Sequence, residues 1–301
     1  MTDLVQVIVS TATIGSALAL VALGYSLVFS ATGIVNFAQG PLLVVAGYGA
    51  YAVTRAGLPV ALALLLAVAG TAAAGAVVEV VALRPLRRDG ADPAAGVGWV
   101  LTTFAAGLVA VDMVRITVDA APHALAPVVG SVFGWSVWRV AGVAVTPTDV
   151  SIVVVTLAAV TGVDVAMSRT ARGRALRAVA QDREAAALMG VDTTTVVTCA
   201  FAAAGALAAV AAVLLAPKVF VRLENGLLLG LEAFVAAVLG GLGSARGALA
   251  GGYAVAAVSA VVRTLSPSGS RYEFVAVFAL FLVTLAVRPS GLFGERTVEK
   301  V

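Results

Sequence analysis

The sequence predicts an all-α polytopic membrane protein in which about nine helices cross the bilayer. Of its 301 residues, 61% are hydrophobic and 12% are charged, and the mean hydropathy is +1.07. Soluble domains are roughly half apolar and a quarter charged, so this chain has too little polar surface to cover a soluble fold. Its apolar residues also form long runs, and runs of about 18 residues or more are typical of membrane helices.

The apolar runs define the expected spans in order. They cover nine segments: 5–30, 38–54, 60–83, 97–118, 149–168, 193–216, 228–242, 246–264 and 271–288. A helix rises about 1.5 Å per residue and the hydrocarbon core is about 30 Å thick, so the seventh run is short for a straight crossing. It is expected to be broken or re-entrant, and eight spans is the competing count.

Positive charge predicts the orientation of these spans. Lys and Arg concentrate in 84–96, 169–192 and the tail from 288, and cytoplasmic loops are enriched in these residues. The expected N-terminus is therefore extracytoplasmic and the C-terminus cytoplasmic. The chain reads as a single transmembrane domain, 1–301, with a first half (1–118), an extracytoplasmic loop (119–148), a cytoplasmic loop (169–192) and a second half (193–301). The expected location is the inner (cytoplasmic) membrane.

The residues for several kinds of chemistry are missing. The sequence has no Gly-rich phosphate-binding loop of the G-x-x-x-x-G-K-[ST] type, and Lys218 and Lys300 are its two lysines. With His123 as the single histidine and Cys199 as the single cysteine, neither a zinc site of usual composition nor a catalytic triad is expected. We therefore expect no catalytic residues, no metal site, no cofactor in this chain and no nucleic acid partner.

The cytoplasmic loop contains an unusual segment, "RGRALRAVAQDREAAALMGVDTTT" (172–195). Apolar residues such as Leu176 and Val179 recur at helical spacing, and Ala186, Ala187 and Gly190 continue a face of small side chains. The pattern predicts one helix through 175–190, which Gly190 ends in the left-handed conformation. A smooth face of this kind suits docking against another protein, although a solvated loop helix is the alternative.

Two interrupted segments are candidates for a transport route. "GIVNFAQG" (33–40) is followed by Pro41, and "GLEAFVAAVLGGLG" (230–243) carries an ionisable residue among glycines. They lie after the first and the sixth span, and paired interrupted segments in corresponding places of inverted repeats point to a translocation path. The candidate residues for the path or its gate are Asn36, Phe37, Gln39, Glu232 and Phe234.

Structural alternatives exist for these polar residues. Asn36 and Gln39 would also serve as interhelical hydrogen-bonding groups or lie in a loop at the membrane interface, and Glu232 would also fit the start of a helix. Charges near other span ends are interpreted as structural: Glu79 near Arg84 and Asp164 near Arg169 are expected to be snorkelling or interfacial charges. Asp112 and Arg115, three residues apart, are expected to pair on one helix face.

Several motifs resemble one family of membrane proteins. Glu184-Ala185-Ala186-x-x-x-Gly190 is similar to the EAA-x-x-x-G coupling motif of ABC importer permeases. The segment around it resembles the branched-chain amino acid permeases, as do "GYSLVFSATGIVNFAQGPLLVVAGY" (24–48), "FVAAVLGGLGSARGALAGG" (234–252) and "RPSGLFGERTVEKV" (288–301). The similarity runs in order along almost the whole chain and is weakest at 119–148. It is greatest to the first permease of the pair, the one with short termini.

The resemblance implies a transport subunit that is not itself an enzyme. Its partners would be a second, homologous permease subunit in a heterodimer, two cytoplasmic ATPase subunits that bind ATP and Mg, and an extracytoplasmic substrate-binding protein. The helix at 175–190 would rest in a cleft of the ATPase and transmit its closure to the spans. The residues implied in this coupling are Arg177, Ala180, Asp182, Glu184, Ala185, Ala186, Leu188, Met189 and Gly190.

The expected cargo is branched-chain or other small amino acids, by family frequency. Relatives that carry urea or short amides give a second possibility for the same machinery. A carrier or channel that works without ATP is the alternative of a different class. It would need an ion or proton relay, and Glu232 and Asp112 are too few ionisable residues to form one.

Overall fold

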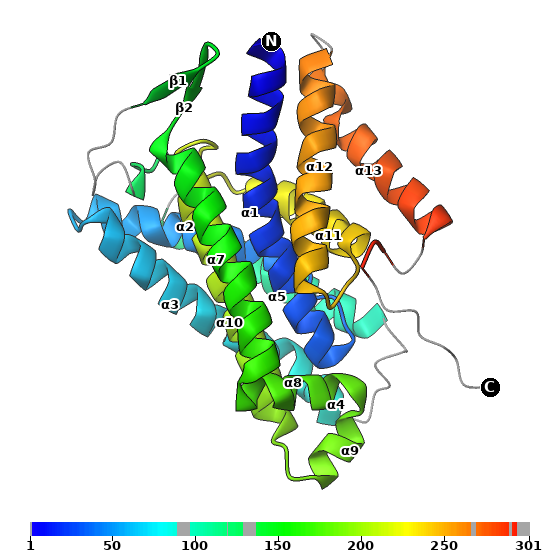
Figure 1. The fold of residues 1–301 in the computed structure, drawn as a ribbon. Helices are drawn as coiled ribbons and strands as arrows, with labels where there is room; N and C mark the ends of the chain where they lie inside the picture. The colour runs from blue at the N-terminus through cyan, green and yellow to red at the C-terminus, as the bar shows by residue number, and fades with distance from the viewer. Residues whose placement is uncertain are drawn as a thin grey trace.

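The structure is a computed structural model that describes residues 2–88, 97–118, 120–128, 137–265, 269–288 and 291–293. It is a helical bundle with one small hairpin (Figure 1). The helices before the hairpin are α1 (Thr2–Thr32), α2 (Gln39–Arg55), α3 (Val60–Val78), the π-helix η1 (Glu79–Leu83), α4 (Arg84–Arg88) and α5 (Val97–Thr117). The hairpin strands are β1 (Trp138–Val140) and β2 (Val143–Val145). They are followed by α7 (Pro147–Arg169), α8 (Ala171–Gln181), α9 (Arg183–Leu188), α10 (Thr193–Leu215), α11 (Asn225–Gly240), α12 (Ala245–Leu265) and α13 (Gly269–Val287).

Helix α1 forms the centre of the bundle. Its residues from Ala17 to Val28 are all buried, and it packs against α12, α10, α11 and α7. The closest approach is to α12, where Gly252 lies against the backbone of Ala19 and the Ser16 and Tyr253 hydroxyls lie 2.8 Å apart. Small residues allow such close approach in membrane helices, so the Gly- and Ala-rich composition is explained by helix packing.

A second close pair joins α3 to α10. Gly75 of α3 lies against the Phe201 carbonyl of α10, and Gly205 of α10 lies against the Thr71 carbonyl of α3. The contact is therefore backbone to backbone in both directions. Any side chain at either glycine would separate the two helices.

Each of the nine expected apolar segments lies in a helix. Six of the described helical segments are long and apolar enough to cross a membrane, namely Thr2–Thr32, Val60–Leu86, Gly98–Thr117, Pro147–Arg169, Thr193–Leu215 and Ala245–Leu265. Helix α11 has 16 residues and α2 has 17. The short seventh run was expected on length alone. The shortness of α2 was not foreseen, because 38–54 was interpreted as an ordinary span.

The bundle has two distinct ends. Figure 1 shows the N-terminus and the β1–β2 hairpin at one end, and α8 and α9 at the other. The Thr2 side chain lies against Gly142 in the hairpin turn. Helix α7 ends at Arg169 and helix α10 begins at Thr193, which agrees with the expected loop at 169–192. Part of the other expected loop, 119 and 129–136, lies outside the described residues.

The last described residues close the end of α11. The backbone N–H groups of Leu292 and Phe293 donate to the carbonyls of Leu239 and Gly240 at 2.8 and 2.9 Å. These carbonyls belong to the final turn of α11 and have no partner within that helix. The buried end of a short helix is thus satisfied by a distant part of the chain.

Candidate functional site

The expected coupling segment is two helices rather than one. Asp182 interrupts it with an extended backbone (φ −155°, ψ 109°), and its carboxylate accepts a hydrogen bond from the Ala185 N–H at 2.9 Å. The prediction of a continuous helix through 175–190 was therefore wrong. An aspartate competes with the helical backbone for hydrogen bonds and is a preferred N-cap, so Asp182 ends α8 and starts α9. The structure gives its carboxylate this local role.

Helix α8 is fastened to the spans on both sides. The Thr170 hydroxyl accepts from the Gly173 N–H at 3.0 Å, and the Arg177 guanidinium donates to the carbonyls of Met167 and Ser168 at the end of α7. Leu176 is buried in a cluster with Val197 and other residues of α10. Arg177, which the resemblance implied in ATPase contact, is thus engaged with its own chain.

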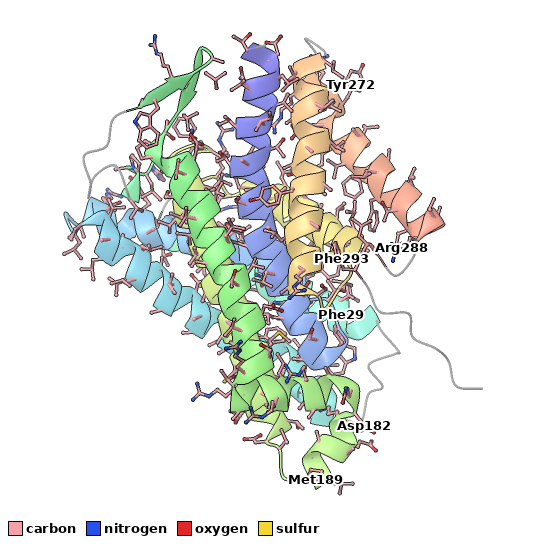
Figure 2. The ribbon with its side chains drawn as sticks, viewed as in Figure 1. Phe29, Asp182, Met189, Tyr272, Arg288 and Phe293 are labelled. Carbon is pink, nitrogen blue, oxygen red and sulfur yellow. The ribbon has the colours of Figure 1, made fainter. Side chains whose placement is uncertain are left out.

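Helix α9 forms the tip at this end of the molecule. Leu188 and Met189 are 89% and 84% exposed, whereas Ala186 is buried. Figure 2 shows Asp182 and Met189 at the end opposite Tyr272. The remaining exposed candidates are Ala180, Glu184, Ala185 and Gly190. The tip therefore presents apolar side chains to the outside, and Ala186 belongs to the inner face.

Gly190 ends the tip as expected. Its φ is +82°, and the Gly190 and Val191 N–H groups both donate at 3.0 Å, to the carbonyls of Ala187 and Ala186. Asp192 then caps α10, because its carboxylate accepts from the N–H groups of Thr194 and Thr195. Hydrogen bonds from the Thr195 hydroxyl and backbone hold the pKa of Asp192 below its ordinary value of 3.8.

The first interrupted segment turns back along α1. Gly33 has φ +70°, and residues 33–38 lead to Gln39, whose amide nitrogen donates to the Ala204 carbonyl of α10 at 2.9 Å. Gln39 fits beside Gly24 of α1, where a larger residue would overlap it. The interruption is confirmed for residues 33–38, because α1 ends at Thr32 and α2 starts at Gln39; Gly40 and Pro41 lie in the first turn of α2.

Asn36 and Gln39 carry buried polar atoms without partners. Their exposures are 1% and 0%, and neither the Asn36 amide nitrogen nor the Gln39 carbonyl oxygen forms a hydrogen bond in the described structure. The other Asn36 atom, Oδ1, accepts from the Ala38 N–H at 3.1 Å. An unsatisfied buried polar group costs about 1–3 kcal/mol, so these atoms are costly unless another state of the protein uses them.

Helix α11 runs unbroken from Asn225 to Gly240, so the expected break within the seventh apolar run is not found. Helices α2 and α11 meet at glycines. Gly40 of α2 lies against Gly226 and Gly230 of α11, and a Cβ on Gly230 would fall 2.7 Å from the Gly40 Cα. The Tyr25 hydroxyl of α1 donates to the Gly230 carbonyl at 3.2 Å. Two segments that the sequence singled out separately therefore form one junction, which we call the glycine crossing (Gly40, Gly226 and Gly230).

Aromatic rings surround this crossing. The Phe37 and Phe234 rings lie 5.5 Å apart, and Phe234 also lies 5.9 Å from Tyr25 and 6.1 Å from Phe281. The structure thus brings Phe37 and Phe234 together, with Asn36 and Gln39 adjacent along the chain. Glu232 is buried, but the charges that act on it come from Arg263 and Glu273 of α12 and α13. It lies about 200° around α11 from Phe234 and belongs to a different face.

The sequence placed Glu79 near Arg84 but missed its burial and its third partner, and it missed a second polar cluster entirely. Glu79, in the π-helix, is fully buried, pairs with Arg84 at 3.1 Å and accepts from the Thr198 hydroxyl of α10 at 2.9 Å. Its interpretation as an interfacial charge was wrong, because α10 covers it. Only the five-residue spacing from Arg84 hinted at the pair. The Asp112–Arg115 pair is confirmed at 3.5 Å.

The second missed cluster joins three elements at the end far from α8 and α9. The Asp149 carboxylate accepts from the Thr13 hydroxyl at 2.7 Å and pairs with Lys218 at 2.8 Å. Thr146, the residue before α7, donates to the same carboxylate through its backbone N–H and its hydroxyl. The Thr-x-x-Asp spacing at 146–149 was a visible capping signal, but nothing in the sequence pointed to Lys218.

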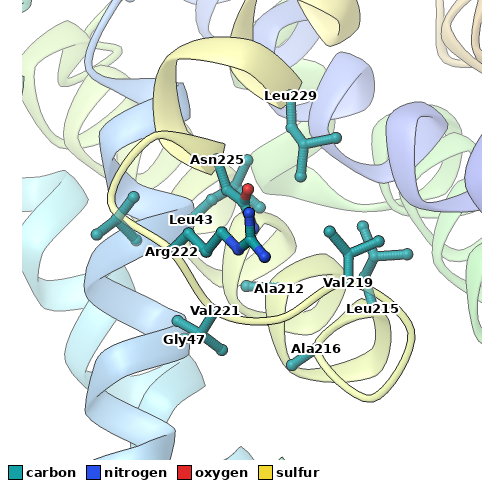
Figure 3. A pocket seen from close by; sticks show the side chains of 11 residues that line it. Leu43, Gly47, Ala212, Leu215, Ala216, Val219, Val221, Arg222, Asn225 and Leu229 are labelled. Atoms are coloured by element: carbon teal, nitrogen blue, oxygen red, sulfur yellow. The ribbon is translucent and has the colours of Figure 1, made fainter. Parts of the chain in front are cut away.

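A pocket opens between α2, the end of α10 and the start of α11 (Figure 3). Its cavity volume is small, about 30 Å³, and the rest of the hollow is open to solvent. Its walls are mostly apolar, and Arg222 and Asn225 supply the polar side chains. Among the described residues, no group of three or more His, Cys, Asp or Glu side chains is placed to hold a metal ion.

Comparison with known proteins decides the family. A family model described as branched-chain amino acid transport system, permease component, matches residues 7–285. The chain belongs to this permease family. The match includes the tip, the glycine crossing and the pocket, so all three lie within the family's shared region.

Individual relatives cover nearly the whole permease. The high-affinity branched-chain amino acid transport system permease protein BraD of Pseudomonas aeruginosa is 33% identical over 98% of this chain and 97% of its own length. The permease protein LivH of Salmonella typhimurium is 32% identical over 96% of this chain and 95% of its own. A probable LivH of Methanocaldococcus jannaschii is 27% identical over 92% and 88%. No solved structure gives a significant match.

These relatives confirm the resemblance seen in the sequence. The chain is a multi-pass membrane permease subunit of a transport system.

Proposed function

We propose that this permease is the first subunit of a heterodimeric, ATP-driven importer that carries branched-chain or other small amino acids across the inner membrane. Its partners are a second, homologous permease, two cytoplasmic ATPase subunits that hold ATP and Mg, and an extracytoplasmic binding protein that delivers the cargo. The names of the relatives support the cargo class. The observation that carries the coupling role is the exposed apolar tip of α9.

The tip has the properties of a docking contact. Leu188 and Met189 are large apolar side chains exposed almost completely, and burying each one against a partner contributes roughly 1.5–3 kcal/mol. Glu184 and Ala185 lie beside them on α9. Surface ion pairs contribute about 0–1 kcal/mol, so apolar contact rather than Glu184 dominates the affinity for the ATPase.

The tip is built to transmit motion. Arg177 and Thr170 fasten α8 to α7, Leu176 packs against α10, and Asp192 starts α10 directly after the tip. A displacement of the tip by an ATPase therefore moves both α7 and α10. Helix α10 also holds Gln39 through Ala204, so its movement reaches the glycine crossing.

The contacts support an inverted repeat. The contact of α1 with α12 corresponds to the contact of α10 with α3. Two further contacts, α1 with α10 and α2 with α11, join the equivalent helices of the two halves. This pattern equates α1 with α10, α2 with α11 and α3 with α12. Helix α1 starts beside the hairpin, whereas α10 starts beside the tip at the other end, so the two run in opposite directions, as inverted repeats require.

The orientation follows from charge and from the repeat. The loop 169–192 carries five arginines, Arg169, Arg172, Arg174, Arg177 and Arg183, and this charge supports a cytoplasmic tip. The N-terminus and the hairpin lie at the opposite end and are extracytoplasmic. The C-terminus is cytoplasmic in this arrangement.

A double substitution tests the coupling role. Leu188→Glu with Met189→Glu changes two exposed side chains, so the permease folds and inserts normally but fails to copurify with the ATPase subunits. Val137→Glu, an exposed apolar position at the other end, is the matched control and leaves copurification unchanged. Normal copurification of the double variant refutes the docking role. Ala186 is avoided because it is buried and a charge there disrupts α9 itself.

A second experiment tests the path. Asn36→Leu removes the unpartnered amide and lowers amino acid uptake, while assembly of the complex is retained. Asn36→Asp keeps the oxygen that accepts from the Ala38 N–H but lacks the amide nitrogen. Comparing it with Asn36→Leu therefore separates the effect of losing that hydrogen bond from the effect of losing the amide nitrogen. Thr161→Val, whose hydroxyl bonds its own helix, is the control. Unchanged uptake by Asn36→Leu removes Asn36 from the route.

Transport assays also separate the competing functions. Uptake of urea or short amides in preference to amino acids, by the same ATP-dependent complex, favours the second cargo. Uptake by the purified permease alone, without ATPase subunits, favours a carrier or channel. The proposed importer requires ATP, the ATPase subunits and the binding protein together.

A further inference from the structure

The single histidine joins two distant stretches of chain at the end of the bundle far from the tip. The His123 N–H donates to the Val221 carbonyl at 3.0 Å, and the Val221 N–H donates to the His123 carbonyl at 2.8 Å. His123 belongs to the segment between α5 and the hairpin, whereas Val221 belongs to the linker 216–224 between α10 and α11. The bridge therefore ties the entrance of α11 to the segment that follows α5.

Helix α2 holds the same segment through two tyrosines. The Tyr51 and His123 rings are stacked, with centroids 3.7 Å apart and planes 10° from parallel. The Tyr48 ring stands nearly perpendicular to the imidazole at 5.8 Å, and its hydroxyl donates to the Ala121 carbonyl at 3.0 Å. The end of α2, the histidine segment and the linker thus form one joint, which we call the outer latch (Tyr48, Tyr51, His123 and Val221).

The linker runs along α2 from the outer latch to the glycine crossing. Val221 packs closely against Gly47 of α2, and Gly226 packs against Val44 and Gly40. Gly47 and Gly40 are seven positions apart, which is about 10 Å along the helix axis. The small cavity of about 30 Å³ lies between the two contacts, where Figure 3 shows Val221 beside Gly47.

The outer latch lies on one side of the crossing only. Leu215 and Ala216, at the end of α10 opposite Asp192, line the same cavity. In the proposed orientation that end of α10 is extracytoplasmic. The latch therefore covers the extracytoplasmic side of the glycine crossing.

The outer latch is built from contacts that can part without unfolding a helix. His123 and Val221 both lie outside the helices, so breaking their bridge leaves every helical hydrogen bond intact. The linker is held on its other side by Lys218, which pairs with Asp149 at 2.8 Å. That pair fastens the linker to α7 and not to α2. A movement of the α11 entrance away from α2 therefore breaks the latch and keeps the ion pair.

We propose that the outer latch is an extracytoplasmic gate, which holds α11 against α2 in the closed state and opens the glycine crossing outward when it is released. The crossing itself consists of glycines, which have no side chains to hold the helices together, so the latch supplies the specific attachment. His123 is its positioning residue, because it forms both the bridge to Val221 and the stack on Tyr51. The inference rests on the proposed function for its orientation and adds a gate to it.

The first test measures access to the crossing from outside. Val44→Cys, in a Cys199→Ala background of the complete complex, is labelled with a membrane-impermeant maleimide in right-side-out vesicles. Val44 is 2% exposed and lies against Gly226, so the reagent reaches it only when α2 and α11 separate. Adding His123→Ala removes the stack and raises the labelling rate about two- to tenfold, which is the shift expected from losing one aromatic pair.

A matched control accompanies this measurement. Tyr272→Ala removes an exposed aromatic ring at the same end of the molecule, on α13 and outside the latch. It leaves the labelling rate of Val44→Cys unchanged. Equal labelling rates with His123→Ala and with Tyr272→Ala overturn the gate.

The second test locks the latch with a disulfide. Residues that exchange both hydrogen bonds across an antiparallel bridge have Cα atoms about 5.5 Å apart, which lies within the range that a disulfide spans. His123→Cys with Val221→Cys, in the Cys199→Ala background, loses leucine uptake when oxidised and regains it when reduced. Arg139→Cys with Ala144→Cys, which are opposite each other in the hairpin, is the matched control and transports equally in both redox states.

The outcomes separate the gate from the proposed function. A wild-type complex that takes up no amino acid refutes the proposed function, and the labelling rates then still decide whether the latch controls access to the crossing. A wild-type complex that works, with an oxidised His123→Cys/Val221→Cys complex equal to it, overturns the gate alone. Failure of these two cysteines to form a disulfide in the resting complex contradicts the bridge and overturns the gate too.

Discussion

The crossing of α3 and α10 allows a sharp test of how this bundle is held together. A Gly75→Ala methyl carbon would lie 3.1 Å from the Phe201 carbonyl carbon and closer still to its oxygen, whereas ordinary van der Waals contact begins at 3.4 Å. The obstructing atoms are backbone, so no side-chain rotation relieves the overlap. Overpacking of this kind costs about 1–3 kcal/mol.

The same helix provides the matched control. Gly70 of α3 is exposed and has no atom within 4 Å of its would-be Cβ. In a helix interior, replacing Gly by Ala is favourable by roughly 0.5–1 kcal/mol, and that gain applies to both positions. The difference between Gly75→Ala and Gly70→Ala therefore isolates the overlap, and we expect it to be about 1–3 kcal/mol.

Thermal unfolding of the two purified variants in the same detergent measures this difference. Gly70→Ala melts at or slightly above the wild-type temperature, and Gly75→Ala melts clearly below it. Equal melting temperatures for the two variants would refute the close α3–α10 contact. Gly205→Ala meets the Thr71 carbonyl from the other side, and combining it with Gly75→Ala gives a loss smaller than the sum, since one separation of the helices relieves both overlaps.

Two further predictions concern the end of α10 that lies next to the tip. Glu79→Gln keeps the hydrogen bond with Thr198 but loses the ion pair with Arg84, and lowers stability by about 1–3 kcal/mol; an unchanged melting temperature would show that the pair contributes nothing. Asp192→Ala removes the cap of α10 and lowers stability at neutral pH. Because the pKa of Asp192 is held below 3.8 by Thr195, its contribution is present above that value and is lost as the pH falls through the lowered pKa. Melting curves of Asp192→Ala and the wild type should therefore converge in acid, and a constant gap would contradict the cap.

The sequence predicted the helical segments well because they are long and uniformly apolar. The loop at 169–192 was placed within a residue at each end by the limits of the apolar runs and by its arginines. The interruption at 33–38 was visible because Gly33 favours the left-handed conformation that ends α1 and Pro41 fits the first turn of the next helix. These features depend on local chemistry, which a sequence contains in full.

The errors arose where long-range contacts decide the role of a residue. From the sequence, Glu79 was interpreted as an interfacial charge, because its contact with Thr198, 119 positions later, is not visible along the chain. Lys218 shows no relation to Asp149 along the chain, yet they pair at 2.8 Å. The break at Asp182 was a local error of another kind: helical periodicity on both sides of it obscured an N-cap signal.

The closure of α11 has a consequence for biogenesis. The carbonyls of Leu239 and Gly240 find their partners in Leu292 and Phe293, 53 positions further along the chain in each case (239 to 292 and 240 to 293). While the ribosome is still making the intervening helices, that end of α11 has no protein partner and must remain hydrated or within the translocon. Helix α11 is therefore among the last elements to reach its final contacts, and deletions near 291–293 should yield a protein that inserts but folds poorly.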